Sequence, residues 1–181
     1  MCGLSMAEAI ILLADRLPSP VSQRILSTLL PASTSLAALR LTRLSAAGCI
    51  LATAGSLIRI WCHHALRKFF TWQVTVQRNH ELITSGPYAI VRHPSYTGWL
   101  LMAAGNLLLL FGPNSYFTAA SLGNTPVGKV AAGAVLIHSL SVTPSLLMRM
   151  GHEDSLLRKE FGTKWDEWAK RTPYRLIPFV Y

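Results

Sequence analysis

One long run of residues, 96–148, carries Lys129 as its only charged side chain, and this run constrains the fold more than any other feature of the sequence. A stretch of that length can hold two membrane spans of about 20 residues each. Turn-forming residues divide it, because Gly112-Pro113-Asn114 ends one apolar run and Gly123-Asn124-Thr125-Pro126 precedes the next. We therefore expect spans near residues 96–111 and 127–148, joined as an antiparallel helical hairpin.

A third apolar segment, residues 44–61, is bordered by basic residues on both sides. Together these segments predict an all-α fold: an integral membrane helical bundle with about three to five transmembrane helices. Residues 1–43 contain only short apolar stretches interrupted by Asp15 and several prolines, so they form a separate N-terminal segment. The sequence leaves open whether that segment adds one broken or partial membrane helix.

Composition agrees with a membrane protein. Charged residues make up only 14% of the 181 residues, although Lys and Arg outnumber Asp and Glu by 17 to 8. Soluble domains usually carry about 25% charged residues, and a chain that is 51% apolar is too hydrophobic to stay disordered. So few charges also argue against nucleic acid as a partner. Because residues 112–126 lack Lys and Arg, we expect them on the lumenal side, and residues 62–95 and 149–181 on the cytosolic side.

Metal chemistry is not indicated. The three cysteines form no CxxC pair, and the adjacent His63 and His64 point to different sides of a helix. We therefore expect no metal site.

The first informative block spans residues 80–99. A turn at Ser85-Gly86-Pro87 leads to His93-Pro94, where proline favours the start of a helix. Several polar side chains then lie at the expected cytosolic end of a span. They could form an interfacial anchor or a binding site. Three glycines, Gly98, Gly105 and Gly112, recur every seven residues and predict close helix packing.

The second block spans residues 149–181. Arg149 and Glu153 are four residues apart, so they share a helix face and can pair, either as a plain salt bridge or as a functional pair at the membrane edge. Residues 153–171 read as one amphipathic cytosolic helix whose apolar side would lie on the bilayer surface. That side comprises Leu156, Leu157, Phe161, Trp165 and Trp168.

The two blocks together resemble the isoprenylcysteine carboxyl methyltransferase family. The resemblance rests on Gln73 and His80, on the run Ser-Gly-Pro-Tyr followed by Arg-His-Pro-Ser-Tyr-x-Gly-Trp, and on Arg-x3-Glu-Asp followed by Phe-Gly-x2-Trp. It covers roughly residues 44–181, which implies a methyltransferase membrane domain with a cofactor-binding segment at residues 73–96. The chain looks short for this family.

The resemblance implies a multi-pass enzyme of the endoplasmic reticulum whose active site faces the cytosol. Such enzymes use S-adenosylmethionine to methylate the C-terminal carboxylate of prenylated CaaX proteins. Arg149 would bind the substrate carboxylate, and Glu153 would complete the catalytic pair. The implied cofactor shell comprises Gln73, His80, Glu81, Leu82, Ile83, Tyr88, His93, Pro94, Ser95, Tyr96 and Glu153. The partners would be prenylated proteins and the lipid bilayer, and the oligomeric state stays open.

Two other classes of function remain possible on sequence grounds. One is a related membrane enzyme that acts on a lipid, either an NADPH-dependent sterol reductase or a lipid N-methyltransferase. The other is a non-catalytic membrane protein in which the motifs only pack helices.

Overall fold

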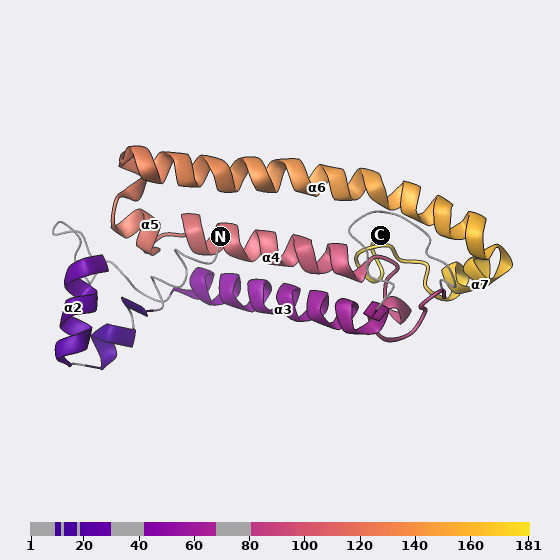
Figure 1. Cartoon of the computed structure of the whole chain (residues 1–181), viewed down its shortest axis with the longest axis horizontal. Coiled ribbons are helices and arrows are strands. Elements are labelled where there is room, and N and C mark those ends of the chain that lie inside the picture. The colour runs from indigo at the N-terminus through magenta and orange to yellow at the C-terminus, as the bar shows by residue number, and fades with distance from the viewer. Residues whose placement is uncertain (1–9, 12, 18, 30–41, 68–80) are drawn as a thin grey trace. The chain divides into compact units, whose positions relative to one another are not determined.

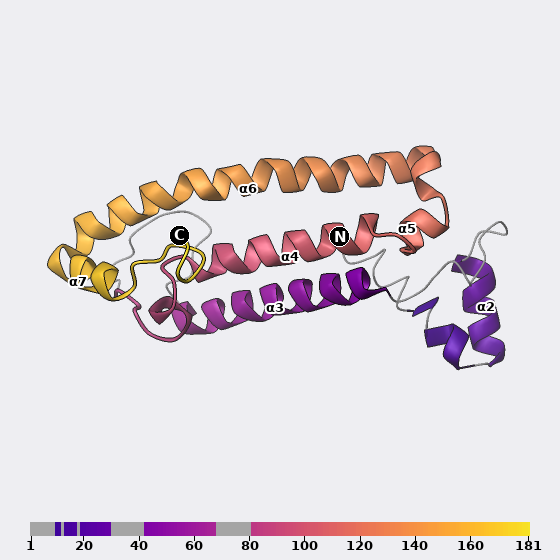
Figure 2. The same cartoon turned by 180° about the vertical axis from the view of Figure 1, so that it is seen from behind.

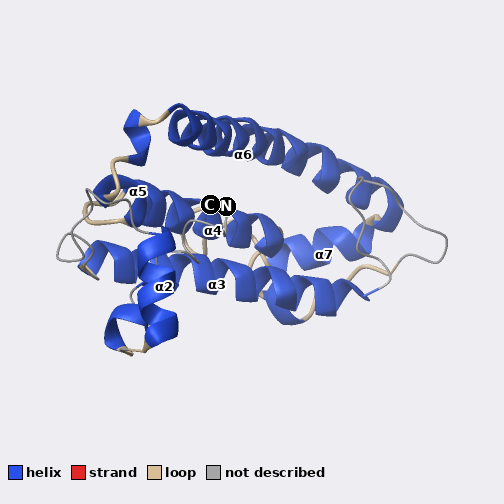
Figure 3. Cartoon of the chain, turned by 60° about the vertical axis from the view of Figure 1, so that its left-hand side comes forward, coloured by secondary structure: helices blue, strands red, loops and turns tan. Residues whose placement is uncertain are grey.

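The computed structural model describes residues 10–11, 13–17, 19–29, 42–67 and 81–181. Helices, turns and loops make up these residues, and no β-strand occurs among them (Figure 3). Three helical segments are long and apolar enough to cross a membrane, namely Arg43–Leu66, Pro94–Ala119 and Pro126–Phe161. The predicted all-α membrane fold is therefore confirmed.

Figure 1 shows the elements in chain order. They are α2 (Pro20–Leu29), α3 (Arg43–Leu66), the short 3-10 helix η3 (Gly86–Ala89), α4 (Pro94–Phe111), α5 (Tyr116–Ala119), the 3-10 helix η4 (Leu122–Asn124), α6 (Pro126–Phe161) and α7 (Thr163–Arg171). Each expected span lies inside one of the long helices. α6 continues well past the expected end at residue 148. The division of the chain at residue 43 stays a prediction.

The chain forms two compact units, each built from parts of the same long helices. The first unit combines Met1–Ala52 with Ala103–Ser139, and the second combines Thr53–Met102 with Leu140–Tyr181.

In the first unit, glycines bring the backbones of α3 and α4 together. A Cβ atom added at Gly105 would lie 2.6 Å from the carbonyl oxygen of Gly48, which is closer than real Cβ contacts. Near the loop after α4, Ile11, Tyr116 and Ala120 form a small buried apolar cluster. The Ser115 side chain begins α5 by accepting a hydrogen bond from the Thr118 N–H.

In the second unit, α3 and α4 make a second close crossing. A Cβ added at Gly98 would lie 2.7 Å from the carbonyl oxygen of Gly55. α3 and α4 run side by side when seen from the front and from behind (Figure 2). The close helix packing predicted for Gly98 and Gly105 is confirmed, with Gly55 of α3 against Gly98, and with Gly48 and Ala52 of α3 against Gly105. It is not found at Gly112, where an added Cβ would meet α3 only at Leu44, at an ordinary 3.8 Å.

The part of α6 in the second unit runs antiparallel to α4. Trp99 donates through Nε1 to the Thr143 hydroxyl at 3.4 Å, and the Tyr96 hydroxyl donates to Glu153 at 2.7 Å. The later residue of α4 thus meets the earlier residue of α6. The expected antiparallel hairpin is therefore confirmed within this unit.

The expected single helix over residues 153–171 is wrong, because Gly162 interrupts it. Gly162 has a φ of +52°, a left-handed conformation that glycine adopts at little cost. α6 ends before it and α7 begins after it. Trp165 and Trp168 are buried by the protein itself, at 8% and 3% exposure, so these two side chains do not form the expected bilayer-facing surface.

Candidate active site

The candidate site is built on the first turn of α4. His93 precedes Pro94, and its carbonyl oxygen accepts the N–H groups of Tyr96 and Thr97 at 3.0 and 3.2 Å. Proline at the first helical position loses no hydrogen bond, because that N–H would have no partner within the helix. The local sequence therefore fixes where the helix begins, and it places the side chains of His93 and Tyr96 on neighbouring turns.

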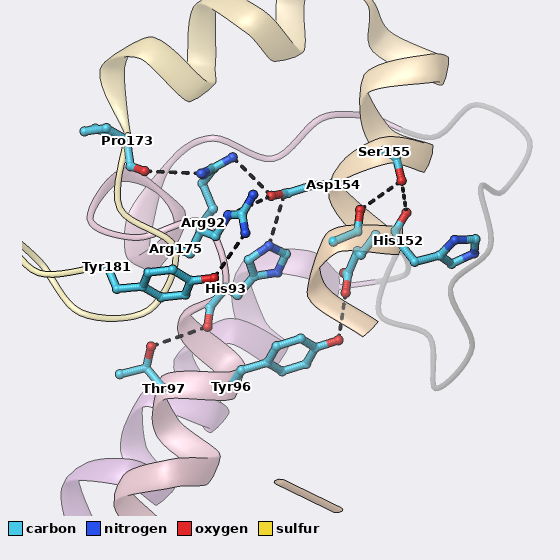
Figure 4. A network of polar contacts seen from close by, with 12 residues as sticks. Arg92, His93, Tyr96, Thr97, His152, Asp154, Ser155, Pro173, Arg175 and Tyr181 are labelled. Carbon is cyan, nitrogen blue, oxygen red and sulfur yellow. Dashed lines mark hydrogen bonds and ion pairs between the residues drawn. The ribbon is translucent and has the colours of Figure 1, made fainter. Parts of the chain in front are cut away.

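Two consecutive carboxylates of α6 meet these two side chains. His93 Nε2 lies 3.1 Å from Asp154 Oδ1, and the Tyr96 hydroxyl donates to Glu153 Oε2 at 2.7 Å. The rings of His93 and Tyr96 are stacked, with centroids 5.5 Å apart and an interplanar angle of 10°. Figure 4 shows both rings turned toward α6. The first informative block and the second are thus joined by two hydrogen bonds.

Asp154 is the centre of a larger polar network (Figure 4). Arg92 Nη1 lies 3.1 Å and Arg175 Nε 3.5 Å from Asp154 Oδ2, while His93 occupies Oδ1. The side chains of Asp154 and Arg92 are only 8% and 11% exposed. A carboxylate removed from water to this extent needs opposite charges and hydrogen bonds around it, and these three basic groups supply them.

The C-terminal segment is attached to the same turn through its backbone. The N–H groups of Arg92 and His93 donate to the carbonyl oxygens of Tyr174 and Arg175, each at 2.9 Å. The Thr97 hydroxyl donates to the Leu176 carbonyl at 2.7 Å. Residues 174–176 therefore lie beside the start of α4 and form part of the site.

Tyr88 of η3 lies half-buried near the same groups. Its hydroxyl is hydrogen-bonded with the Cys62 thiol of α3, and its carbonyl oxygen accepts Nε1 of Trp168 at 3.0 Å. Burial raises the pKa of Tyr88 far above its usual range, and the neighbouring Cys62 and the Glu153 carboxylate raise it further. Tyr88 is therefore a neutral hydroxyl at every physiological pH.

The remaining residues of the predicted cofactor shell are placed as follows. Gln73 and His80 lie outside the described residues. Glu81, Leu82 and Ile83 lie in an irregular segment before η3, where Glu81 is exposed and the other two are half-buried. Ser95 lies in the first turn of α4, and Arg59 of α3 donates to its hydroxyl at 3.4 Å and to its carbonyl at 3.3 Å. The structure thus brings Tyr88, His93, Pro94, Ser95, Tyr96 and Glu153 into one region of the second unit.

Arg149 lies one helical turn before Glu153 on α6 and is half-buried. This spacing puts both side chains on the face of α6 that meets Tyr96. A pairing of Arg149 with Glu153 stays a prediction.

Sequence reasoning missed Asp154, whose carboxylate contacts three basic side chains, those of Arg92, His93 and Arg175. It also missed the role of the tail, including Arg175. One signal was present: an acidic residue directly follows Glu153, and two basic residues, Arg92 and His93, precede Pro94. Nothing in the sequence, however, shows that these residues meet.

Known proteins support the family suggested by the motifs. The family model described as "Isoprenylcysteine carboxyl methyltransferase (ICMT) family" matches residues 47–127. Protein-S-isoprenylcysteine O-methyltransferase B of Arabidopsis thaliana is 28% identical over 135 residues, which are 74% of this chain and 58% of that protein. Protein-S-isoprenylcysteine O-methyltransferase of Rattus norvegicus is 29% identical over 143 residues, 78% of this chain and 43% of that protein.

A second group of proteins is also similar over a smaller part of the chain. Delta(14)-sterol reductase TM7SF2 of Mus musculus is 31% identical over 108 residues, which are 56% of this chain and 20% of that protein. The chain spans about three-fifths of the length of the first plant methyltransferases that it matches. The family match covers α4 and most of α3, and the methyltransferases align over more of the chain than the reductase does, so the resemblance of this chain to the isoprenylcysteine carboxyl methyltransferase family is confirmed.

Proposed function

We propose that this chain is a protein-S-isoprenylcysteine carboxyl O-methyltransferase. It would use S-adenosylmethionine to methylate the C-terminal carboxylate of prenylated cysteine in processed CaaX proteins. The observation that carries the proposal is the meeting of the two motif blocks, since Tyr96 binds Glu153 at 2.7 Å and His93 binds Asp154 at 3.1 Å. Residues that are far apart in sequence and belong to the family motifs thus lie together in one polar site at the start of α4, which we call the polar mouth.

The side chains at this mouth fit S-adenosylmethionine chemically. The cofactor combines a cationic sulfonium and amino group with a flat base, a ribose and a carboxylate. Glu153 offers a negative charge for a cation, and the half-buried rings of Tyr88 and Tyr96 offer flat surfaces for the base and ribose. The buried His93 ring supports Tyr96 by stacking on it. When bound, S-adenosylmethionine supplies an electrophilic methyl group at this mouth.

Arg149 would hold the substrate carboxylate. An α-carboxylate has a pKa of about 3.3–3.7 and is already ionised at neutral pH, so the reaction requires no general base. A guanidinium can bind both carboxylate oxygens at once and so fix the direction of attack. Glu153, one turn away, would share the charge of Arg149, so that the carboxylate keeps its nucleophilicity. The contribution of the protein would be orientation and the exclusion of water.

The membrane setting suits such a substrate. A prenyl chain gains about 0.8 kcal/mol for each buried CH₂, so the substrate resides in the bilayer. The charged cofactor resides in the cytosol. A site at the mouth of membrane-spanning helices can reach both, and we place the enzyme in the endoplasmic reticulum membrane with this mouth facing the cytosol.

Methyl transfer to N-acetyl-S-farnesylcysteine tests the proposed activity. Membranes that contain the protein should transfer a tritiated methyl group from S-adenosylmethionine to this acceptor, and membranes without it should not. N-acetylcysteine without the prenyl group is the matched acceptor control. An equal rate with both acceptors, or no transfer at all, would refute the proposed function.

The similarity to a Delta(14)-sterol reductase favours one second candidate, a reductase that uses NADPH. The two candidates differ in the cofactor they bind. Calorimetric titration of the purified protein with S-adenosylmethionine and with NADPH separates them, and we expect heat of binding only with the former. Binding of neither cofactor would favour a non-catalytic membrane protein.

The proposed orientation can be tested with glycosylation acceptors. An Asn-x-Thr site inserted between residues 114 and 124 should be glycosylated in microsomes, and one inserted after residue 171 should not. The reverse pattern would overturn the orientation.

A further inference from the structure

Asp154 makes contacts that the proposed methyl transfer does not use. It is 6% exposed, and its two oxygens are shared among three basic side chains that come from two separate segments. Arg92 and His93 lie about sixty residues before it, and Arg175 lies in the C-terminal segment. One buried carboxylate therefore connects the start of α4, the cytosolic part of α6 and the tail.

The contact with Asp154 fixes which nitrogen of the His93 ring donates a hydrogen bond, and it fixes the orientation of the ring. A carboxylate only accepts hydrogen bonds, so the Nε2 atom of His93 donates to Asp154. In the neutral ring, the lone pair is then on Nδ1, and the plane of the ring is set by the carboxylate. Because the ring stacks on Tyr96, the orientation of both rings depends on Asp154.

The contacts with the two arginines fix the tail. Arg92 binds Asp154 with Nη1 and the Pro173 carbonyl with Nη2, at 3.1 and 3.2 Å. Its own N–H and that of His93 donate to the tail carbonyls of Tyr174 and Arg175. Arg175 then returns from the tail to the same carboxylate at 3.5 Å. The loss of Asp154 would leave two guanidinium groups partly buried without their counter-charge, and these contacts would loosen together.

We propose that Asp154 is a positioning residue that acts on the site in two ways: it sets the ring of His93, and it clamps residues 173–176 against the start of α4. The inference rests on the proposed function in so far as His93 and Tyr96 belong to the cofactor site. Asp154 itself touches the residues that form the mouth, and it acts through them. Its neighbour Glu153 faces Tyr96 and serves the site directly.

Hydrogen exchange of the full chain in detergent tests the clamp without any need for activity. Asp154→Asn keeps the size of the side chain and removes its charge, so the amides of residues 92 and 93 should exchange at least about tenfold faster than in the wild type. Asp166→Asn is the matched control, because it removes the same charge from an exposed pair, in which Asp166 binds Arg158 at 2.9 Å and not any of the three basic partners of Asp154. Exchange at 92 and 93 within twofold of the wild type in Asp154→Asn would overturn the proposal.

Cofactor binding tests the effect on the rings. With Asp154→Asn, the Kd and KM for S-adenosylmethionine should rise about tenfold, while kcat at saturating cofactor should fall by less than threefold. A purely structural role would instead lower the amount of active protein and leave the KM of the remainder unchanged, and that result would overturn the positioning role.

A second variant covers the case in which Asp154→Asn does not fold. Arg175→Gln removes one arm of the clamp at a side chain that is 37% exposed. It should raise exchange at residues 92 and 93 by a smaller factor, about threefold, and leave the Nε2 contact of His93 intact. Wild-type exchange in this variant would also overturn the clamp. If the wild-type protein transfers no methyl group, the proposed function fails, whereas the exchange result still decides whether Asp154 holds the tail.

Discussion

The two compact units differ in how their helices begin. In the first unit, α2, α3, α5 and α6 each follow a hydroxyl residue whose oxygen accepts a backbone N–H; these residues are Ser19, Thr42, Ser115 and Thr125. In the second unit, α4 follows His93 and α7 follows Gly162, which offer no hydroxyl. The start of α4 is held instead by the tail and by contacts from Asp154 to Arg92 and His93.

This difference separates local from distant determinants of structure. A hydroxyl cap needs only residues within one helical turn, so the first unit can define its helix starts independently of the rest of the chain. The start of α4 needs residues from α6 and from the C-terminal segment. Changes in the second unit should therefore affect function through distant contacts, whereas changes in the first unit should affect stability locally.

The largest expected effect is that of Arg149→Lys in the second unit. Lysine keeps the charge and cannot bind both oxygens of a carboxylate, and a misplacement of about 1 Å can cost on the order of 100-fold in rate. We expect kcat to fall by about that factor, with the Kd for S-adenosylmethionine unchanged. The control is Arg158→Lys, which changes an exposed arginine on the same helix. Near-wild-type kinetics for Arg149→Lys would remove Arg149 as the carboxylate anchor.

The glycine crossings should behave alike in the two units, which sharpens the comparison. Gly105→Ala in the first unit and Gly98→Ala in the second both place a Cβ against backbone atoms of α3. Overpacking of this kind typically costs about 1–3 kcal/mol. Thermal unfolding in detergent should show both losses. Gly133→Ala is the control, because a Cβ at Gly133 meets nothing within 4 Å; an equal loss there would contradict the packing role.

Removal of a hydroxyl cap should have a smaller, local effect. Thr125 accepts the Gly128 N–H at 3.0 Å at the start of α6. Thr125→Ala should lower the free energy of unfolding by about 1 kcal/mol and leave methyl transfer unchanged. Thr125→Ser keeps the hydroxyl and should retain most of that stability. A loss of activity in Thr125→Ala would show that the start of α6, in the first unit, also affects the site in the second unit.

The smallest effect is expected for Asp166→Asn. The Arg158–Asp166 pair is 2.9 Å long, but its side chains are 63% and 39% exposed. Exposed pairs contribute about 0–1 kcal/mol, so the melting temperature should hardly change, and added salt should have little further effect. A large loss would show that this pair supports the nearby Trp165.

The sequence predicts those features of the fold that depend on near neighbours. The apolar runs predicted the three long helices, and the seven-residue spacing of Gly98 and Gly105 predicted their close packing. The break at Gly162 was missed, because amphipathic periodicity continues across it and only the backbone conformation reveals the interruption.

The candidate site was predicted less completely. Arg149 and Glu153 are readable because they are four apart on one helix, and the motifs identify His93 and Tyr96. Asp154 could not be assigned in the same way. Its role depends on Arg92 and Arg175, which are brought to it only by the fold, and no local periodicity encodes that meeting.

The length of α6 has a consequence for where chemistry can take place. Its 36 residues rise about 1.5 Å each, so the helix is roughly 54 Å long, whereas the hydrocarbon layer of a bilayer is about 30 Å thick. A helix that enters this layer near Pro126 leaves it about twenty residues later, and Arg149 and Glu153 follow within the next two turns. The number of α6 residues that follow the predicted span therefore decides how far Arg149 and Glu153 lie from the end of that span. Insertion of a single residue between the span and these side chains would change both their distance from its end and the face of α6 on which they lie.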